Sequence, residues 1–328
     1  MTSPLATVGV LSIGQMGLGI AKLLVAHNYR VLTNVSNRSP ATQKRAQDAQ
    51  LGLVSNDVEL VAESDYILSI VPPRDAVATA NRVIDALKGS STASKTTPLY
   101  YLDLNAVAPS TAKSIAEAFA QNSSDKELRF VDGGIIGGSP APKADEAWTK
   151  PGIPLSGPYP LSEAPHSGAD LAEVLNTRFV DEKIGSASGL KCCFAALSKG
   201  MTALLLQSFS TASSLGVMPH LQSYLEEFNP SAAARAEKSI TGCPSKAYRW
   251  VEEMNQIGEC FAEEGGWAER AKVFRQIADV YDGLAIVVDK RGGTEGMDTA
   301  QGAIGALREG LQKRDRRMSV EELEQDDR

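Results

Sequence analysis

Short apolar runs alternate with amphipathic stretches along the first half of the chain. Runs such as Thr7–Ile13, Arg30–Val35 and Tyr66–Val71 are rich in β-branched and aliphatic residues, and stretches of helical periodicity follow them. This alternation predicts parallel strands joined by helices. The same pattern predicts further strands at Leu99–Leu104, Arg129–Val131, Ile153–Ser156 and Thr177–Ile184, and helices at Ile20–Ala26, Ala41–Asp48, Asp75–Leu87, Thr111–Gln121 and Leu171–Leu175.

The second half of the chain is helical throughout. Leu190–Leu215 is a long apolar stretch without proline, and it predicts one helix that begins near a domain boundary. The sequence therefore predicts a dinucleotide-binding domain over residues 1–188 and an all-helical domain over residues 189–328. Later helix breaks are expected at Pro219, Pro230, Pro244, Gly265–Gly266 and Gly292–Thr294. Ser90–Pro98 is expected to form a surface loop, and Gln312–Arg328 a solvated helix or frayed tail.

Composition narrows the functional classes. The 328 residues are 43% apolar, which is enough for sizeable cores, and the net charge of −7 argues against a nucleic-acid partner. Neither a signal peptide nor an uninterrupted apolar run of about 20 residues is apparent, so a cytoplasmic protein outside the membrane is expected. The four cysteines and three histidines have no metal-ligand spacing, which predicts reduced thiols and no metal site.

A glycine-rich loop lies between the first strand and the first helix. Residues 12–17 read Ser-Ile-Gly-Gln-Met-Gly, in the place of a Rossmann phosphate loop. Small residues there allow the backbone to approach a pyrophosphate at the helix N-terminus. Ser12 replaces the usual first glycine, and serine can make the turn if its φ stays negative. A tight turn without a ligand is the alternative interpretation.

The end of the second strand indicates which cofactor binds. An NAD enzyme presents Asp or Glu there to the ribose 2′-OH, whereas this chain has Asn37, Arg38 and Ser39. Arginine and serine are donors suited to a 2′-phosphate. The sequence therefore predicts NADP(H), unless Arg38 is only a solvated turn residue.

These motifs resemble those of the β-hydroxyacid dehydrogenases, relatives of 6-phosphogluconate dehydrogenase. Asp103–Pro109 is similar to the family's Asp-x-Ser-Thr-x-x-Pro stretch, Val131–Gly138 to its glycine-ended substrate strand, and Gly185–Lys191 to the approach to its catalytic lysine. Ser198–Leu206 and Lys246–Met254 resemble stretches of a subgroup of uncharacterised 6-phosphogluconate dehydrogenase-like proteins. The resemblance implies a Rossmann-type domain, an all-α domain that begins with a long interdomain helix, and a homodimer whose C-terminal helices complete the neighbour's active site.

Three positions depart from the family pattern. Asn105-Ala106 replaces Ser-Thr, Ile136 replaces a serine before two glycines, and Ala195 stands where an asparagine is usual. These losses suggest a small-molecule substrate that is larger or less polar than a short hydroxy acid.

The resemblance makes Lys191 the candidate proton donor and acceptor, because the nicotinamide carries only the hydride. A cap or surface lysine is the alternative. Lys199 lies two helical turns further, and could be a neighbouring cation, an anion-binding group or a lysine with its stem on the helix surface. Asn105 is a candidate contact to the ribose or substrate, or a turn residue, and Trp250 is a candidate cleft residue or a core tryptophan.

The candidate site residues form three groups. The catalytic residue is Lys191. The cofactor-binding candidates are Ile13, Gly14, Gln15, Met16, Gly17, Asn37, Arg38, Ser39, Val71, Pro72, Pro73 and Asn105. The substrate candidates are Asn105, Ile136, Gly137, Gly138, Lys199, Trp250, Glu253 and Met254.

The sequence favours an NADP(H)-dependent oxidoreductase that acts on a β-hydroxy acid or its carbonyl counterpart. An NADPH-dependent imine reductase is the first alternative. Lys191 favours carbonyl chemistry, whereas the loss of polar residues at the three departures from the family pattern favours imine reduction. A non-catalytic NADPH-binding sensor or scaffold is the second.

Overall fold

The computed structural model describes residues 3–89, 97–144 and 147–311. Most of the predicted loop Ser90–Pro98 and the predicted tail Gln312–Arg328 lie outside these residues. The chain forms two compact units, residues 1–194 and residues 195–328. The predicted boundary between residues 188 and 189 falls in the same helix, α7 (Ser186–Ser214), and stays a prediction.

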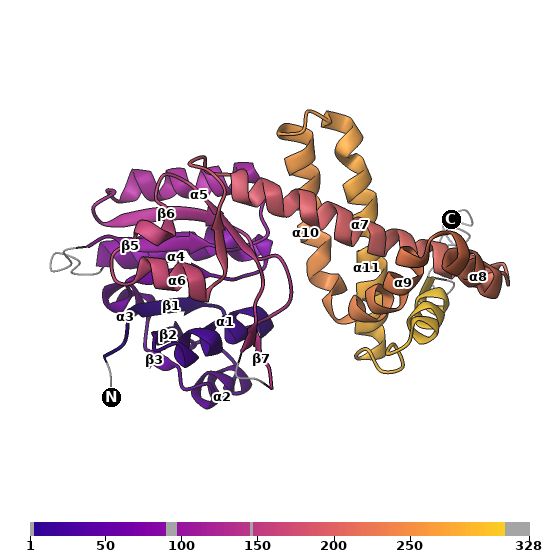
Figure 1. Cartoon of the computed structure of the whole chain (residues 1–328), viewed down its shortest axis with the longest axis horizontal. Helices are drawn as coiled ribbons and strands as arrows, with labels where there is room; N and C mark the ends of the chain where they lie inside the picture. The colour runs from indigo at the N-terminus through magenta and orange to yellow at the C-terminus, as the bar shows by residue number, and fades with distance from the viewer. Residues whose placement is uncertain (1–2, 90–96, 145–146, 312–328) are drawn as a thin grey trace, which may run out of the picture. The chain divides into compact units, whose positions relative to one another are not determined.

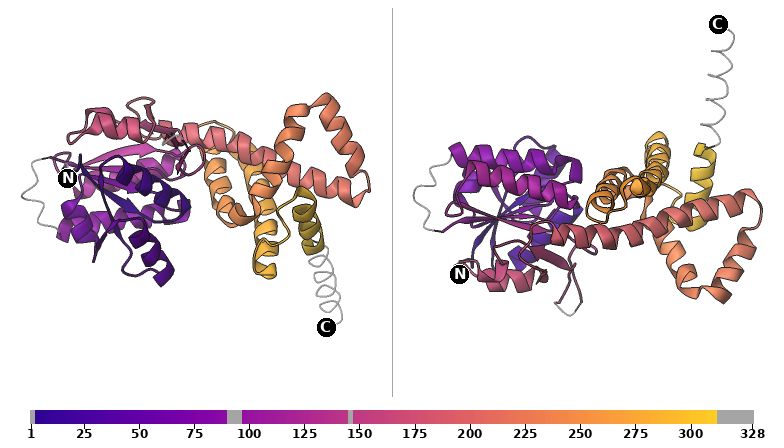
Figure 2. Two further views of the ribbon diagram at one scale, coloured as in Figure 1. Left: turned by 60° about the horizontal axis from the view of Figure 1, so that its bottom comes forward. Right: turned by 90° about the horizontal axis from the view of Figure 1, so that it is seen from above.

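The first unit contains a mostly parallel sheet (Figures 1 and 2). In the described part of the chain the strand order is β10-β9-β6-β5-β4-β1-β2-β3, and β9 runs antiparallel to β6. The strands are β1 (Thr7–Leu11), β2 (Arg30–Asn34), β3 (Gly52–Val54), β4 (Tyr66–Ser69), β5 (Leu99–Asp103), β6 (Leu128–Gly133), β9 (Ile153–Ser156) and β10 (Thr177–Phe179). The order reverses between β1 and β4, where a ligand crevice is expected in open α/β sheets.

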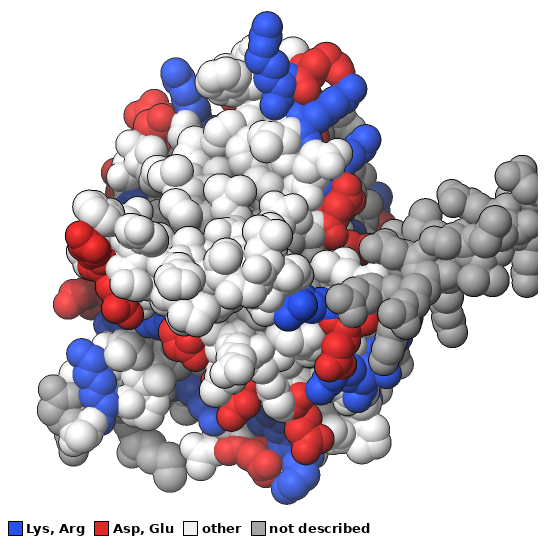
Figure 3. Space-filling model, turned by 90° about the vertical axis from the view of Figure 1, so that its right-hand side faces the viewer, with Lys and Arg blue, Asp and Glu red and all other residues white. Residues whose placement is uncertain are grey.

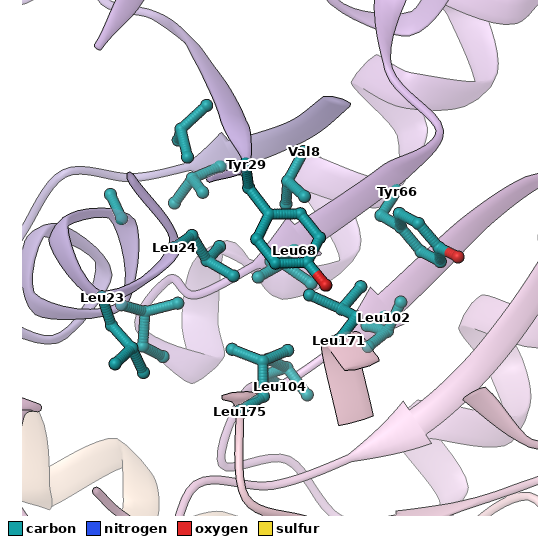
Figure 4. Close-up of a cluster of buried hydrophobic side chains, with 14 of the residues drawn as sticks. Val8, Leu23, Leu24, Tyr29, Tyr66, Leu68, Leu102, Leu104, Leu171 and Leu175 are labelled. Carbon is teal, nitrogen blue, oxygen red and sulfur yellow. The ribbon is translucent and has the colours of Figure 1, made fainter. Parts of the chain in front are cut away.

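Helices cover both faces of this sheet, and each face has its own core. On one face, α1 (Gln15–Ala26) and α6 (Gly168–Val174) pack against the strands through Leu23, Leu24 and Leu171 (Figure 4). On the other face lie α3 (Asp57–Glu63), α4 (Ala76–Gly89) and α5 (Pro109–Asn122). The doubly wound Rossmann-type fold predicted from the alternation of elements is therefore confirmed.

Several small elements do not follow the hydrophobic pattern. Strand β3 and helix α3 were not predicted, because Gly52 and Leu53 are exposed and α3 has only seven residues. The strands β7 (Ala141–Pro142) and β8 (Trp148–Thr149) pair as a short hairpin inside the Pro/Gly-rich passage. The predicted strand Thr177–Ile184 ends at Phe179.

The second unit is helical, as predicted. After α7 come α8 (Met218–Phe228), α9 (Pro230–Gly242), α10 (Ala247–Glu263), α11 (Val273–Arg291) and a helix over residues 300–311. Helices α10 and α11 pack through edge-to-face ring pairs, Trp250 with Tyr281 and Phe261 with Phe274. Gly292 ends α11 in the left-handed region, at φ 73°.

Among the described residues, α7 alone is long and apolar enough to cross a membrane by its composition. Half of its most apolar window is buried within the protein. Buried core helices can pass the same test, and α7 carries lysines at positions 191 and 199.

Candidate functional site

A cavity of about 450 Å³ lies at the carboxyl ends of β1, β2 and β4. The predicted cofactor residues Ile13, Gly14, Arg38, Val71 and Pro72 are among its lining. The other lining residues come from the same strand ends and from α2 (Pro40–Asp48) and α4: Leu11, Ser12, Asn34, Val35, Thr42, Arg45, Asp75, Ala78, Thr79 and Arg82. The structure thus brings the glycine loop, the Asn37-Arg38 turn and the Val71–Pro72 segment to one place.

The glycine loop can take this form only because Gly17 has no side chain. A Cβ there would lie 2.0 Å from the carbonyl oxygen of Ser12. Gly14 is the N-cap of α1, and Gln15, Met16 and Gly17 form its first turn, whose N–H groups have no partner within the helix. Such a helix N-terminus favours an anion such as a pyrophosphate.

Ser12 corrects one expectation. Its φ is +81°, in the left-handed region, and not negative as predicted from the residue type. The tight return of the loop to α1 sets this conformation, and it costs a non-glycine residue about 1–2 kcal/mol. The position thus keeps the geometry of the usual glycine although the residue is serine.

The end of β2 forms a second, smaller cavity of about 230 Å³. Asn34, Ser36, Asn37 and Arg38 line it together with Asp57 and Arg82. The hydroxyl of Ser39 has a structural role instead. It caps the N-terminus of α2 by accepting a hydrogen bond from the Thr42 N–H at 3.3 Å. Asn37 and Arg38 therefore stand at a cavity, while Ser39 shapes the helix beside it.

Arg45, Asp57 and Arg82 were not predicted as site residues from the sequence. Arg45 lies on α2 six residues after the end of the predicted motif, and its guanidinium donates to the Thr42 hydroxyl at 3.0 Å. Asp57 of α3 and Arg82 of α4, which lie 25 residues apart in the sequence, form an ion pair. Arg45 could have been predicted as a site residue, because it follows the Asn37-Arg38-Ser39 motif closely in the sequence. Asp57 and Arg82 lie beside the cavity only because of the way the chain folds.

Asn105 holds the β4 end rather than projecting into the cavity. The residue is 2% exposed; its Oδ1 accepts from the Val71 N–H at 2.7 Å, and its Nδ2 donates to the Ser69 hydroxyl at 3.0 Å. These bonds fix the segment that runs into Pro72 and the buried Pro73. Asn105 is thus a positioning residue here, and a direct contact to cofactor or substrate stays a prediction.

Asp103 is a buried carboxyl beneath Asn105. Its Oδ1 accepts from the Asn105 N–H at 3.0 Å, and its Oδ2 has no hydrogen-bond partner in the described structure. Burial raises the pKa of Asp103 to about 7, and the nearby Asp132 also raises it. The side chain therefore titrates close to neutral pH.

We expect Asp103→Asn to stabilise the protein more at high pH than at low pH. The ordinary pKa is 3.8 and the folded pKa about 7, so the folded state holds the proton more tightly between these values. Wild-type stability therefore falls as pH rises through this window, by up to about 1.4 kcal/mol per pH unit, and the asparagine removes that loss. Melting temperatures of both proteins at pH 5 and pH 8 test this; a difference that does not change with pH contradicts it.

A buried network holds the start of α7, which carries Lys191. Asp132 at the end of β6 accepts hydrogen bonds from the Ser156 hydroxyl at 2.9 Å, the Gly185 N–H at 2.9 Å and both donors of Ser188. The Ser156 hydroxyl also accepts from the Ala187 N–H at 3.0 Å. Burial raises the pKa of Asp132, while these donors act in the opposite direction. The first turn of α7 is thereby fastened to the sheet.

Lys191 lies against the predicted substrate strand. Its Nζ donates to the Ile135 carbonyl oxygen at 2.5 Å, and its stem crosses Gly134, where a Cβ would lie 2.9 Å from the lysine Cβ. Ile136 pairs with Gly152 through both backbone groups, at 2.9 and 2.8 Å. The structure therefore brings Lys191 together with the segment that leads to the exposed Gly137 and Gly138.

The other substrate candidates cluster in the second unit. The Lys199 ammonium pairs with the Glu253 carboxylate and lies 5.4 Å from the centre of the Trp250 ring. The two charged side chains are 10% and 13% exposed, and Met254 is fully buried. Lys199 therefore belongs to a largely buried ion pair, and its contact with a substrate stays a prediction.

Two parts of the chain match known families. Residues 7–148 match the NAD binding domain of 6-phosphogluconate dehydrogenase, and residues 212–284 match a domain of unknown function, DUF1932. An uncharacterised 28.5 kDa protein of Methanothermus fervidus, from a 7S RNA 5′ region, is 28% identical over 230 residues, which are 66% of this chain and 76% of that protein.

Solved structures share the fold over nearly the whole chain. A conserved hypothetical protein from Sinorhizobium meliloti 1021 is 21% identical with a TM-score of 0.60, over 94% of this chain and 97% of that one. The 3-hydroxyisobutyrate dehydrogenase of Mycobacterium tuberculosis is 16% identical with a TM-score of 0.58, over 92% and 99%. The first unit is thus a nicotinamide-dinucleotide-binding domain, followed by a helical region of a second recognised type.

Proposed function

The chain belongs to the 6-phosphogluconate dehydrogenase-like family, and on this premise we propose that it is an NADP(H)-dependent oxidoreductase acting on a β-hydroxy acid or its carbonyl counterpart. One observation carries the proposal. The unit with the glycine-loop cavity and Arg38 also holds Lys191 of α7, against the segment that follows strand β6 of the same sheet.

The residues at the cavity fit a dinucleotide. Gly14 and Gly17 leave the backbone open at the N-terminus of α1, so the first-turn amides would hold the pyrophosphate. Arg38 and Asn37 line the cavity at the end of β2, where the adenosine ribose belongs in this fold. No carboxylate comes from the end of β2 itself, which favours NADP(H) over NAD(H).

Lys191 is the proposed proton donor and acceptor. The bound nicotinamide supplies or accepts the hydride. The ammonium would polarise the substrate oxygen and deliver a proton to it in reduction, and the neutral amine would take that proton back in oxidation. Its hydrogen bond to the Ile135 carbonyl and the close fit over Gly134 hold the amine in one position before substrate arrives.

Imine reduction is the second candidate, and the apolar residues near the lysine favour it. Ile136 replaces a family serine, and the buried Ala195 replaces the asparagine one turn after Lys191. A carbonyl panel and a cyclic-imine panel, each with NADPH, separate the two. Turnover of carbonyls alone supports the first proposal, and turnover of imines alone supports the second.

We expect Arg38→Ala to weaken NADPH binding about 10- to 100-fold and to leave NADH binding nearly unchanged. The reason is the loss of a charge-assisted contact that only the 2′-phosphate can make. Calorimetric titration of wild type and variant with both nucleotides measures this. Equal weakening for both nucleotides argues against an NADP-specific site, and absence of binding to wild type overturns the whole proposal.

We also propose a homodimer, supported by helix α8. This helix of 11 residues buries none of them, and Tyr224 and Phe228 stack at 6.1 Å while they are 64% and 73% exposed. Figure 3 shows a broad area without charged side chains on the side where α8 lies. Exposed aromatic side chains such as Tyr224 and Phe228 would gain from burial against a second copy of the chain. Completion of the neighbour's active site by C-terminal helices is part of this proposal.

We expect wild type to have the mass of a dimer in light scattering after gel filtration, and Phe228→Asp to shift it toward the monomer. A charge in an apolar interface has no partner and disfavours association. Val77→Asp, at an exposed apolar residue of α4, is the control and should leave the mass unchanged. A monomeric wild type contradicts the proposal.

The cysteines, none of which forms a disulfide, also support a reducing compartment such as the cytoplasm. Cys192, Cys243 and Cys260 are buried and Cys193 is exposed, and all four are unbridged. Fractionation of cells with an antibody to the protein would test the cytoplasmic location.

A further inference from the structure

A second carboxylate lies at the cavity that Arg38 lines. Asp57 is the first residue of α3, and it faces the smaller cavity with Asn37 and Arg38. Its side chain is 18% exposed, so a nucleotide in that cavity would meet it. A carboxylate at the end of β2 is the group with which a Rossmann domain accepts the ribose 2′-OH of NAD, and it repels a 2′-phosphate.

In this chain the Asp57 carboxylate already has two protein partners, Arg82 and Asn34. Arg82 of α4 donates through Nε to one oxygen at 2.9 Å and through Nη2 to the other at 3.0 Å, in a two-pronged ion pair. The Asn34 amide of β2 donates to the same carboxylate at 2.7 Å. Arg82 itself lines both cavities.

We propose that Arg82 sets the cofactor preference by neutralising Asp57. This inference rests on the proposed function. With Arg82 present, the charged groups that line the two cavities are three arginines and two aspartates, an excess of positive charge that attracts the 2′-phosphate. Without Arg82 the excess disappears, and Asp57 keeps only the neutral Asn34 amide as a partner.

A freed Asp57 would act on the two nucleotides in opposite directions. It would repel the 2′-phosphate of NADP(H) and accept a hydrogen bond from the 2′-OH of NAD(H). Arg82 is thus a specificity-determining residue that acts through Asp57, and Arg38 is the residue that binds the phosphate. A purely structural ion pair between α3 and α4 would instead affect both nucleotides alike.

The experiment measures dissociation constants of NADPH and NADH for wild type, Arg82→Gln, Asp57→Asn and the double variant. Arg82→Gln is expected to lower the preference for NADPH about tenfold or more, with NADH binding kept or tightened. The double variant is expected to return the preference to within about threefold of wild type, because no carboxylate remains to be neutralised.

Two controls separate charge from folding. Arg30→Gln removes the same charge from an exposed ion pair with Glu63 at the start of β2, at the far end of that strand from the cavity, and should change neither constant. Asp57→Asn alone should keep NADPH binding at least as tight as in wild type, and it tests the proposal if Arg82→Gln does not fold.

Three results overturn the inference. They are equal weakening of both nucleotides in Arg82→Gln, a double variant no more selective than Arg82→Gln, and loss of NADPH binding in Asp57→Asn. The second result would mean that Arg82 contacts the phosphate itself. If wild type prefers neither nucleotide, the proposed NADP(H) preference fails and this inference fails with it; wild-type preference with unchanged variants defeats the inference alone.

Discussion

Lys191→Met is expected to lower kcat about 100- to 10,000-fold while the dissociation constant of NADPH stays within about threefold of wild type. Methionine keeps the length and apolar stem that cross Gly134 but has no proton to give. Lys191 does not line the cavity at the glycine loop, so cofactor binding should not depend on its charge. Steady-state turnover of the best substrate, with NADPH titration in parallel, separates the two effects.

Lys183→Met is the matched control. This lysine lies in an exposed position just before α7, so its loss removes the same charge at little structural cost. Its kcat should remain within about twofold of wild type, as for most surface substitutions. A Lys191 variant that retains most of its turnover would show that another group, or water, transfers the proton, and would favour the cap-residue interpretation.

The sequence predicted the central strands β4 and β5 because nearly all of their residues are apolar or aromatic. Tyr66–Ser69 and Leu99–Asp103 are buried at every position, so their pattern is unmistakable. The glycine loop was predicted for a related reason, because Gly17 has to be glycine for a local steric cause. The steric requirement at one residue and the apolar pattern of one strand can both be inferred from a single sequence.

Contacts between distant segments were not predictable in the same way. The Asp57–Arg82 pair depends on how α3 and α4 pack, and neither residue stands in a motif. Asn105 was noticed, but its role depends on Ser69 and Val71, which lie more than 30 residues away. The positive φ of Ser12 was also not predicted. A serine ordinarily adopts a negative φ, and the left-handed conformation is imposed here by the folded loop.

The hydrogen-bond network around Asp132 also joins distant segments of the chain, and its loss is expected to affect stability. The resemblance identified Gly185–Lys191 as the approach to the lysine, but Asp132 lies more than 50 residues earlier and was named only as part of the substrate strand. In the structure it accepts hydrogen bonds from two N–H groups at the start of α7 and from two hydroxyls. The carboxylate therefore joins β6, β9 and α7 at one buried point.

Asp132→Ala is expected to lower the free energy of unfolding of the first unit by about 3 kcal/mol or more. The alanine leaves four buried donors without their acceptor, and these donors cannot reach water. The same change frees the first turn of α7, so kcat should fall together with stability because Lys191 loses its fixed position. Chemical denaturation and turnover of the same preparation measure both effects.

Asp181→Ala is the control, because it removes a carboxylate from the same helix end in a less buried place. Asp181 accepts from the Ser186 hydroxyl at 2.9 Å and the Lys183 N–H at 2.8 Å, and water can replace it. Its loss should cost about 1 kcal/mol or less and leave kcat nearly unchanged. Equal destabilisation by the two alanines would mean that the helix N-terminus needs any carboxylate nearby. A large loss for Asp132 alone would mean that the buried junction of β6, β9 and α7 is what holds the lysine in place.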